Sequence, residues 1–126
     1  MPDCPLDLTQ VPSFEALQYE PFYGWLRQQL LAREMEKARE QGAGCVSLLQ
    51  IAPAHNVELG KVTSPALRPL GDSATAVWQR MVTGDRFQSI STEVLFAPLL
   101  ANPSEPWKAW ATEIAQRYPW VLETGL

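Results

Sequence analysis

The residues best suited to chemistry lie in a predicted loop at residues 53–73. This loop holds His55, the only histidine of the chain, followed by Asn56, Glu58 and Lys61. It comes directly after a predicted buried strand, and open parallel sheets bind ligands at the carboxyl ends of their strands. One hypothesis is therefore a small-ligand-binding domain that uses this loop, with His55 and Asn56 as candidate site residues. The simpler interpretation, which we favour, is a loop whose Asn and His side chains cap its own backbone.

The sequence contains no complete set of residues for a metal site or for nucleophilic catalysis. One histidine and two distant cysteines, Cys4 and Cys45, supply no zinc ligand set at a standard spacing. A Cys45–His55 nucleophile pair is conceivable, but Cys45 lies in a predicted apolar strand and is expected to be inert. Gly42 and Gly44 precede a strand, whereas phosphate-binding glycines follow one and open a helix. We therefore predict no catalytic residue, no metal ligand and no cofactor.

Other acidic and aromatic side chains fit structural positions better than chemical ones. Glu34 and Glu36 are two residues apart on a predicted helix, where side chains do not face each other, so we interpret both as solvated. Trp107 and Trp110 could stack on nucleic-acid bases, but their helical spacing is more typical of core residues. Trp78 is likewise predicted to be a core residue.

The composition indicates one acidic globular domain. The chain has 126 residues, of which 46% are hydrophobic, and a formal net charge of −4. Proteins that bind DNA on their own usually carry a basic footprint, and none is visible. Two cysteines fit a reduced, cytoplasmic protein better than a disulfide scaffold. The apolar runs are far too short to span a membrane.

The hydrophobic pattern predicts a small, mostly helical α/β domain with a short parallel sheet. Residues 1–18 contain three prolines and are expected to be an irregular segment, so the single domain covers residues 19–126. The predicted elements are a helix at 21–41, a strand at 45–52, a helix at 72–83 capped by Asp72 or Ser73, a strand at 86–90, a helix at 92–100 capped by Ser91 or Thr92, and a last helix from about 104 to 118. The strand–helix–strand crossover implies a parallel pair.

The two predicted strands make an incomplete sheet. The strand at 45–52 is almost continuously apolar, which is typical of a strand covered on both faces. Two strands alone leave backbone groups unpaired at their edges. We therefore expect a homodimer or a partner chain to complete the sheet. The alternative is that residues 6–18 supply the missing edge.

Three segments resemble the carboxyl-terminal part of a restriction-endonuclease-like family within the PD-(D/E)XK nuclease superfamily. The segments are YEPFY and RQQLL within residues 19–31, LLQIAPAHN at 48–56, and VTSP, DRF and SISTE within 62–96. The resemblance implies the carboxyl-terminal half of a restriction-endonuclease-like fold, in which a helix follows the catalytic hairpin and precedes the next strand.

The active site of that superfamily lies in the preceding hairpin and binds a divalent metal through an acidic residue, an Asp and a (Asp/Glu)-x-Lys motif. These residues cannot be placed in this chain, because the similar string at Glu34–Lys37 lies within a predicted helix. No catalytic residue is carried over. The resemblance implies only that Tyr23 and Gln28 are neighbours of a site built elsewhere. Mg²⁺ is implied only if the chain completes a nuclease site, and nucleic acid only through a partner.

These observations favour a non-catalytic, nuclease-derived domain that acts through protein interaction or self-association. The first alternative is one part of a metal-dependent nuclease whose active site lies on an upstream or partner chain. The second alternative is the small-ligand-binding domain with its site in the loop at residues 53–73.

Overall fold

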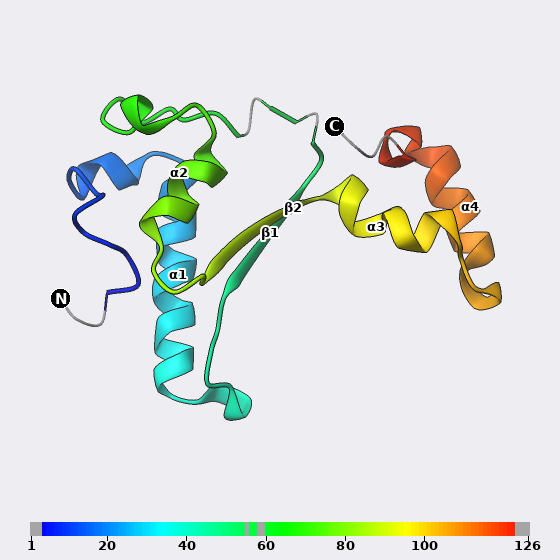
Figure 1. Cartoon of the computed structure of the whole chain (residues 1–126), viewed down its shortest axis with the longest axis horizontal. Coiled ribbons are helices and arrows are strands. Elements are labelled where there is room, and N and C mark those ends of the chain that lie inside the picture. The colour runs from blue at the N-terminus through cyan, green and yellow to red at the C-terminus, as the bar shows by residue number, and fades with distance from the viewer. Residues whose placement is uncertain (1–3, 55, 58–59, 123–126) are drawn as a thin grey trace. The chain divides into compact units, whose positions relative to one another are not determined.

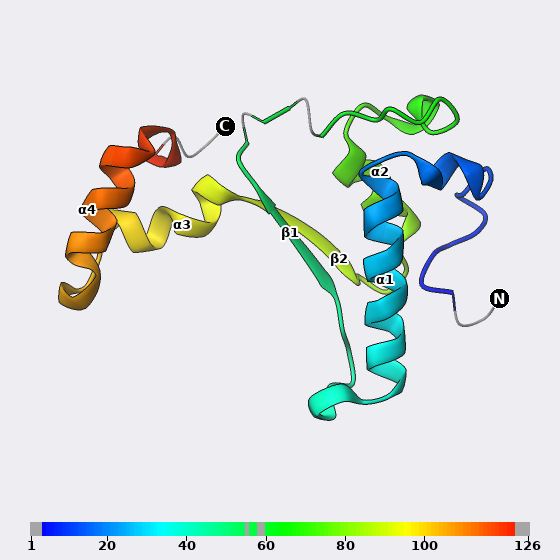
Figure 2. The same cartoon turned by 180° about the vertical axis from the view of Figure 1, so that it is seen from behind.

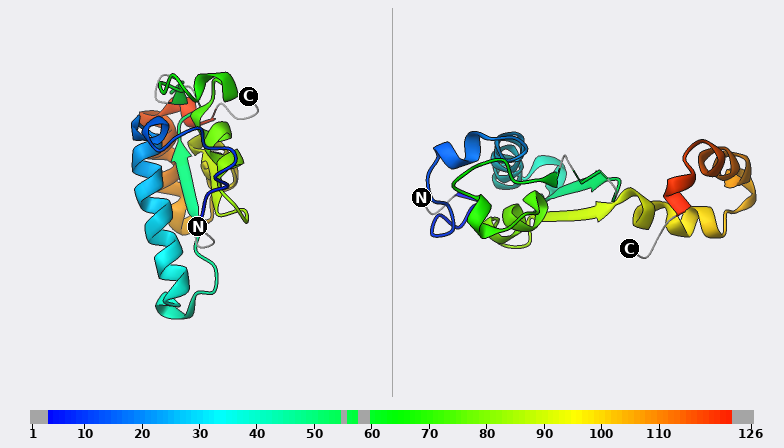
Figure 3. Two further views of the ribbon diagram at one scale, coloured as in Figure 1. Left: turned by 90° about the vertical axis from the view of Figure 1, so that its left-hand side faces the viewer. Right: turned by 90° about the horizontal axis from the view of Figure 1, so that it is seen from above.

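The computed structural model describes residues 4–54, 56–57 and 60–122. Its helices and strands, in chain order, are α1 (Phe22–Lys37), β1 (Leu48–Ala52), α2 (Ala74–Met81), β2 (Phe87–Ser91), α3 (Thr92–Ala101) and α4 (Lys108–Arg117) (Figure 1). This order and the parallel pairing of β1 with β2 confirm the predicted small α/β fold. The two strand arrows run in the same direction (Figure 3).

The chain forms two compact units. The first unit comprises residues 1–50 and 57–89, and the second comprises residues 51–56 and 90–126. Within the residues that the structure describes, each unit has buried side chains of its own.

An aromatic core holds the first unit together. Trp78 of α2 and Phe22 of α1 are both fully buried, and their ring centroids lie 6.1 Å apart. Trp25 of α1 contacts Phe87 of β2, with ring centroids 5.2 Å apart. Seen from behind, α1 lies in front of α2 (Figure 2). Phe22, Trp78 and Phe87 belong to one core cluster, against which Leu48 of β1 also packs. The prediction of Trp78 as a core residue is confirmed.

The face of helix α1 that is buried in the core differs from the face that its apolar residues predict. Its buried residues are Phe22, Leu26, Gln29, Ala32 and Glu36. Leu30 and Met35, which helical spacing places with the apolar stripe, are 45% and 37% exposed. Two polar side chains thus occupy core positions of the helix, and the reason lies in their hydrogen bonds, which join them to residues far along the chain.

Strand β1 is shorter than predicted, and its side chains are more exposed to solvent than predicted. It begins at Leu48, so Cys45 lies outside the strand and is exposed, which corrects its expected burial. Side chains alternate between the two faces of a strand. Leu48 packs against the core, whereas Leu49 and Ile51 are 56% and 47% exposed. The chain itself therefore covers one face of β1, and the face that carries Leu49 and Ile51 is open within the described residues.

The N-terminal segment packs against the end of α2. Leu6 forms an isolated antiparallel bridge with Val82, and the N–H of Thr83 donates to the carbonyl of Pro5 at 2.9 Å. A 3-10 helix follows at Glu15–Gln18. Within the described residues the segment pairs with neither strand of the sheet.

Serine side chains begin two of the helices, as predicted. The Ser73 hydroxyl accepts from the N–H of Ala76 at the start of α2, and the Ser91 hydroxyl accepts from the N–H of Val94 at the start of α3. Each hydroxyl satisfies an N–H that has no partner within its helix.

The second unit has a small core. Helices α3 and α4 pack with a 3-10 helix at Pro119–Leu122, and Ala111 and Val121 are buried among them. The ring of Trp110 contacts Phe96 and Trp107 at centroid distances of 6.0 and 6.3 Å. Trp107 itself is 56% exposed, so its prediction as a core residue was wrong. None of the helices within the described ranges is long and apolar enough to cross a membrane.

Candidate functional site

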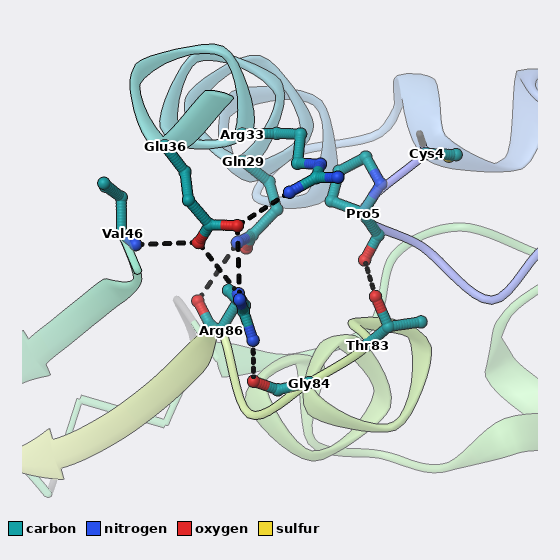
Figure 4. Close-up of a pocket in the computed structure, with 9 residues that line it drawn as sticks. All are labelled: Cys4, Pro5, Gln29, Arg33, Glu36, Val46, Thr83, Gly84 and Arg86. Carbon is teal, nitrogen blue, oxygen red and sulfur yellow. Dashed lines mark hydrogen bonds and ion pairs between the residues drawn. The ribbon is translucent and has the colours of Figure 1, made fainter. Parts of the chain in front are cut away.

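A small pocket lies in the first unit where the chain enters both strands. It has a volume of about 240 Å³ and is lined by Cys4, Pro5, Gln29, Arg33, Glu36, Val46, Thr83, Gly84 and Arg86 (Figure 4). Val46 precedes β1 and Arg86 immediately precedes β2. The pocket therefore lies at the amino ends of the strands, opposite to the carboxyl ends where open parallel sheets commonly bind ligands.

The carboxylate of Glu36 is the centre of the pocket's hydrogen-bond network. Its Oε1 accepts from the Arg86 Nε at 3.0 Å and from the Val46 N–H at 2.9 Å. Its Oε2 accepts from the Arg86 Nη2 at 3.2 Å and from the Arg33 Nη1 at 2.7 Å. Bidentate guanidinium–carboxylate contacts of this kind fix geometry as well as add energy. Glu36 thus joins α1 to the beginnings of both strands, and its interpretation as a solvated surface residue was wrong.

The surroundings of Glu36 strongly favour its ionised form. Hydrogen bonding from the Arg86 side chain, followed by the Val46 N–H, lowers the pKa of Glu36 from 4.5 to about 2, although burial acts in the opposite direction. The same contact with Glu36 raises the pKa of Arg86. A carboxylate with so low a pKa is a poor general base near neutral pH. Glu36 is therefore a fixed negative charge and not a proton carrier.

Gln29 connects this network to the aromatic core. Its Nε2 donates to the backbone carbonyl of Arg86 at 3.0 Å, and its Oε1 accepts from the Trp78 Nε1 at 3.4 Å. The Gln29 side chain is fully buried, so these bonds satisfy polar groups that are shielded from water. Gln29 thereby links α1, α2 and the start of β2 at one point.

A second buried carboxylate lies in the second unit, after the strands. Glu93 is 1% exposed, and the N–H of Ala54 donates to its two carboxylate oxygens at 3.2 and 3.0 Å. It fixes the backbone that follows β1. Within the described ranges no group of three or more His, Cys, Asp or Glu residues could hold a metal ion.

The site residues predicted from the sequence do not come together in the pocket. Tyr23 is 40% exposed on α1 and lies beneath the Arg27 guanidinium, which is 5.9 Å from the ring centroid. Gln28 and Asn56 are exposed. His55 lies outside the described residues.

One signal could have identified Gln29 and Glu36. Starting from Phe22, the positions at 26, 29 and 36 follow the spacing of one helix face, so these two polar residues share the face of Phe22 and Leu26. A polar residue at a core position of a helix requires a partner. The identity of that partner, Arg86, could not be read from α1 alone.

The fold and the site together describe a small α/β protein whose pocket contains a structural ion-pair network. The model of the family described as Restriction Endonuclease associating with ARP matches residues 4–119. The chain belongs to this family, which confirms its resemblance to restriction-endonuclease-like proteins. No curated protein and no solved structure gives a significant match.

Proposed function

We propose that this chain is a non-catalytic, restriction-endonuclease-like domain that acts by associating with another protein chain. The observation that carries the proposal is the solvent-exposed face of β1. Leu49 and Ile51 point away from the core and are 56% and 47% exposed. Large exposed apolar side chains that lie together commonly mark a protein interface.

The edge of β1 supports the same proposal. The sheet contains only β1 and β2 within the described residues, so β1 has one neighbouring strand. Natural edge strands are usually protected by charged residues, prolines or bulges. The sequence of β1, LLQIA, contains neither a charged residue nor a proline. This edge can accept another strand through backbone hydrogen bonds, and alternate side chains of that strand would pack beside Leu49 and Ile51.

The description of the family supplies a candidate for the partner. It names association with ARP, and we propose that ARP contributes the segment that pairs with β1. Self-association through the same edge is the competing possibility. A further one is that the partner supplies the carboxylates and lysine of a PD-(D/E)XK active site, so that the complex is a metal-dependent nuclease.

Binding of the wild-type chain to ARP, measured by calorimetry, tests the proposal against a Leu49→Lys variant. Burying an apolar side chain contributes about 1.5–3 kcal/mol, so placing a charge at this position is expected to weaken binding at least about tenfold. Leu31→Lys is the matched control, because Leu31 is 61% exposed and belongs to α1, not to β1. Equal binding by the Leu49→Lys variant and the wild type would contradict the proposed interface.

Two further measurements separate the alternatives. Sedimentation equilibrium of the chain alone reports self-association, which the Leu49→Lys substitution should abolish if the edge of β1 mediates it. Incubation of the complex with DNA and Mg²⁺ reports a completed nuclease. Cleavage by the complex, absent from either chain alone, would assign the nuclease function to the assembly.

A further inference from the structure

We propose that the outward face of α1, which carries Leu30 and Leu31, binds the same face of a second copy of this chain. The two helices pair antiparallel around a two-fold axis that passes between these leucines. This surface is separate from β1, so the inference goes beyond the proposed partner interface and can fail independently of it. It rests on the apolar side chains of the outward face and on the order of its charges.

Helix α1 carries apolar side chains on two sides. One side contacts the core through residues that include Phe22 and Leu26. On the outward face the side chains of Tyr23, Leu30 and Leu31 are exposed within the described residues. The two leucines follow Tyr23 by seven and eight positions, which is the spacing of residues on one face of a helix. A surface helix normally presents polar residues outward, so this apolar face indicates contact with another molecule.

Two charged residues flank the leucines symmetrically. Arg27 precedes Leu30 by three positions, and Glu34 follows Leu31 by three positions. Because a helix rises about 1.5 Å per residue, each charge lies about 5 Å along the axis from the midpoint between the leucines. An antiparallel helix centred on the same midpoint places its Glu34 beside Arg27 and its Arg27 beside Glu34. In the same arrangement, Leu30 meets Leu31 of the second copy, so the face is complementary to itself.

Both charged side chains are accessible in the single chain. Glu34 is 68% exposed, although it pairs with Lys37 at 3.1 Å. Its carboxylate offers about four acceptor positions, so it can accept from Lys37 and from a second cation. Arg27 is exposed, and its guanidinium lies 5.9 Å from the ring centroid of Tyr23. A guanidinium that stacks on an aromatic ring can still bind a carboxylate through the N–H groups at its edge.

The order of the charges disfavours a parallel pair of helices. A two-fold axis along parallel helices brings every residue to its own copy. Arg27 would then face Arg27 and Glu34 would face Glu34, and such like-charge contacts oppose association. Antiparallel helices also place the positive amino end of each helix dipole beside the negative carboxyl end of the other. The charges therefore select the antiparallel arrangement.

Sedimentation equilibrium of the full chain tests the association. We expect the wild type to form dimers at micromolar concentration. Leu31→Lys should weaken the dimer about a hundredfold, because each lost apolar contact costs about tenfold and the two-fold axis repeats the substitution. Leu49→Lys is the matched control, since Leu49 is similarly exposed but belongs to β1. A wild type that stays monomeric, or a dimer that only Leu49→Lys weakens, would overturn the proposal.

A pair of charge reversals tests the antiparallel register. In Arg27→Glu and in Glu34→Arg the opposed residues carry like charges, so each variant alone should dimerise more weakly than the wild type. An equimolar mixture of the two variants should form a heterodimer, because the opposed charges are again of opposite sign. Circular dichroism verifies that both variants are folded. A mixture that stays as monomeric as either variant alone would rule out the antiparallel pair.

Binding of ARP separates this surface from the proposed partner interface. Leu31→Lys should lose self-association and bind ARP as the wild type does, whereas Leu49→Lys should show the reverse. This pattern supports two distinct surfaces on the first unit. Loss of ARP binding with retained self-association in a folded Leu31→Lys variant would assign the outward face of α1 to ARP, and would overturn its pairing with a second copy.

Discussion

Arg86 binds Glu36 side-on, with its Nε 3.0 Å from one carboxylate oxygen and its Nη2 3.2 Å from the other. The two residues are 50 positions apart in the sequence. Glu36 lies near the end of α1 and Arg86 just before β2, so their contact fixes the helix against the start of the sheet. The stability of the first unit should therefore depend on the charge of Glu36.

A Glu36→Gln variant is expected to be less stable than the wild type at neutral pH and to lose that difference in acid. The pKa of Glu36 is lowered from 4.5 to about 2 in the folded chain. Its ionised form therefore stabilises the fold fully above the unfolded value, and this contribution disappears as the pH falls from about 4.5 to about 2. Urea midpoints measured across this range provide the test.

Glu34→Gln is the matched control for this pH dependence. Glu34 is 68% exposed and pairs with Lys37 on the helix surface, where ion pairs contribute little. Its substitution should change the urea midpoint only slightly at any pH. A stability difference for Glu36→Gln that remained constant from pH 7 to pH 2 would contradict the linkage to the Glu36 charge.

Gln29→Leu should destabilise the first unit through unsatisfied polar groups. The substitution leaves the Trp78 indole N–H and the Arg86 carbonyl without their partner. Each buried group left unpaired costs about 1–3 kcal/mol. Gln28→Leu is an internal comparison on the exposed side of the same helix, where substitutions usually change stability by about 0.5 kcal/mol or less. Equal urea midpoints for the two variants would refute the role of Gln29.

Trp78→Ala should cost about 3–5 kcal/mol of unfolding free energy, as large-to-small aromatic substitutions in a core do. Trp78 is fully buried, and its ring lies 6.2 Å from that of Trp25. Trp107→Ala should cost much less, because Trp107 is 56% exposed in the second unit. Denaturant unfolding followed by circular dichroism measures both. A cost below about 1 kcal/mol for Trp78→Ala would be incompatible with its observed packing.

The isolated chain is expected not to cleave DNA. The carboxylate–lysine set of the resembled nucleases could not be placed in the sequence, and Glu36 is engaged by two arginines. Purified chain incubated with plasmid and single-stranded DNA in Mg²⁺ and in Mn²⁺ checks this. Cleavage that persists through repurification and follows the protein peak would reverse the expectation.

Local signals in the sequence predicted much of the fold. The order of helices and strands followed from hydrophobic periodicity, and Ser73 and Ser91 were recognisable as caps because their hydroxyls act on N–H groups only three residues away. Trp78 was identified from the apolar phase of α2. Each of these features depends on residues within one or two helical turns of one another. A short stretch of sequence is therefore enough to predict it.

The pocket could not be predicted in this way. Glu36 and Gln29 owe their burial to Arg86 and Trp78, which are about fifty residues further along the chain. Read locally, Glu36 is one of several charges at the end of a helix. The face of β1 that the chain itself leaves open could not be identified for a related reason: a continuous apolar run is equally compatible with a strand covered on both faces and with one that is exposed on one side.

The long sequence separation between α1 and its aromatic partners also has a consequence for synthesis on the ribosome. The core of the first unit closes only when Trp78 and Phe87 join residues of α1. At roughly 5–20 residues per second, translation of the intervening segment takes several seconds. During this time Phe22 and Leu26 lack their final cover. Nascent α1 is therefore open to chaperones and to premature association during this interval.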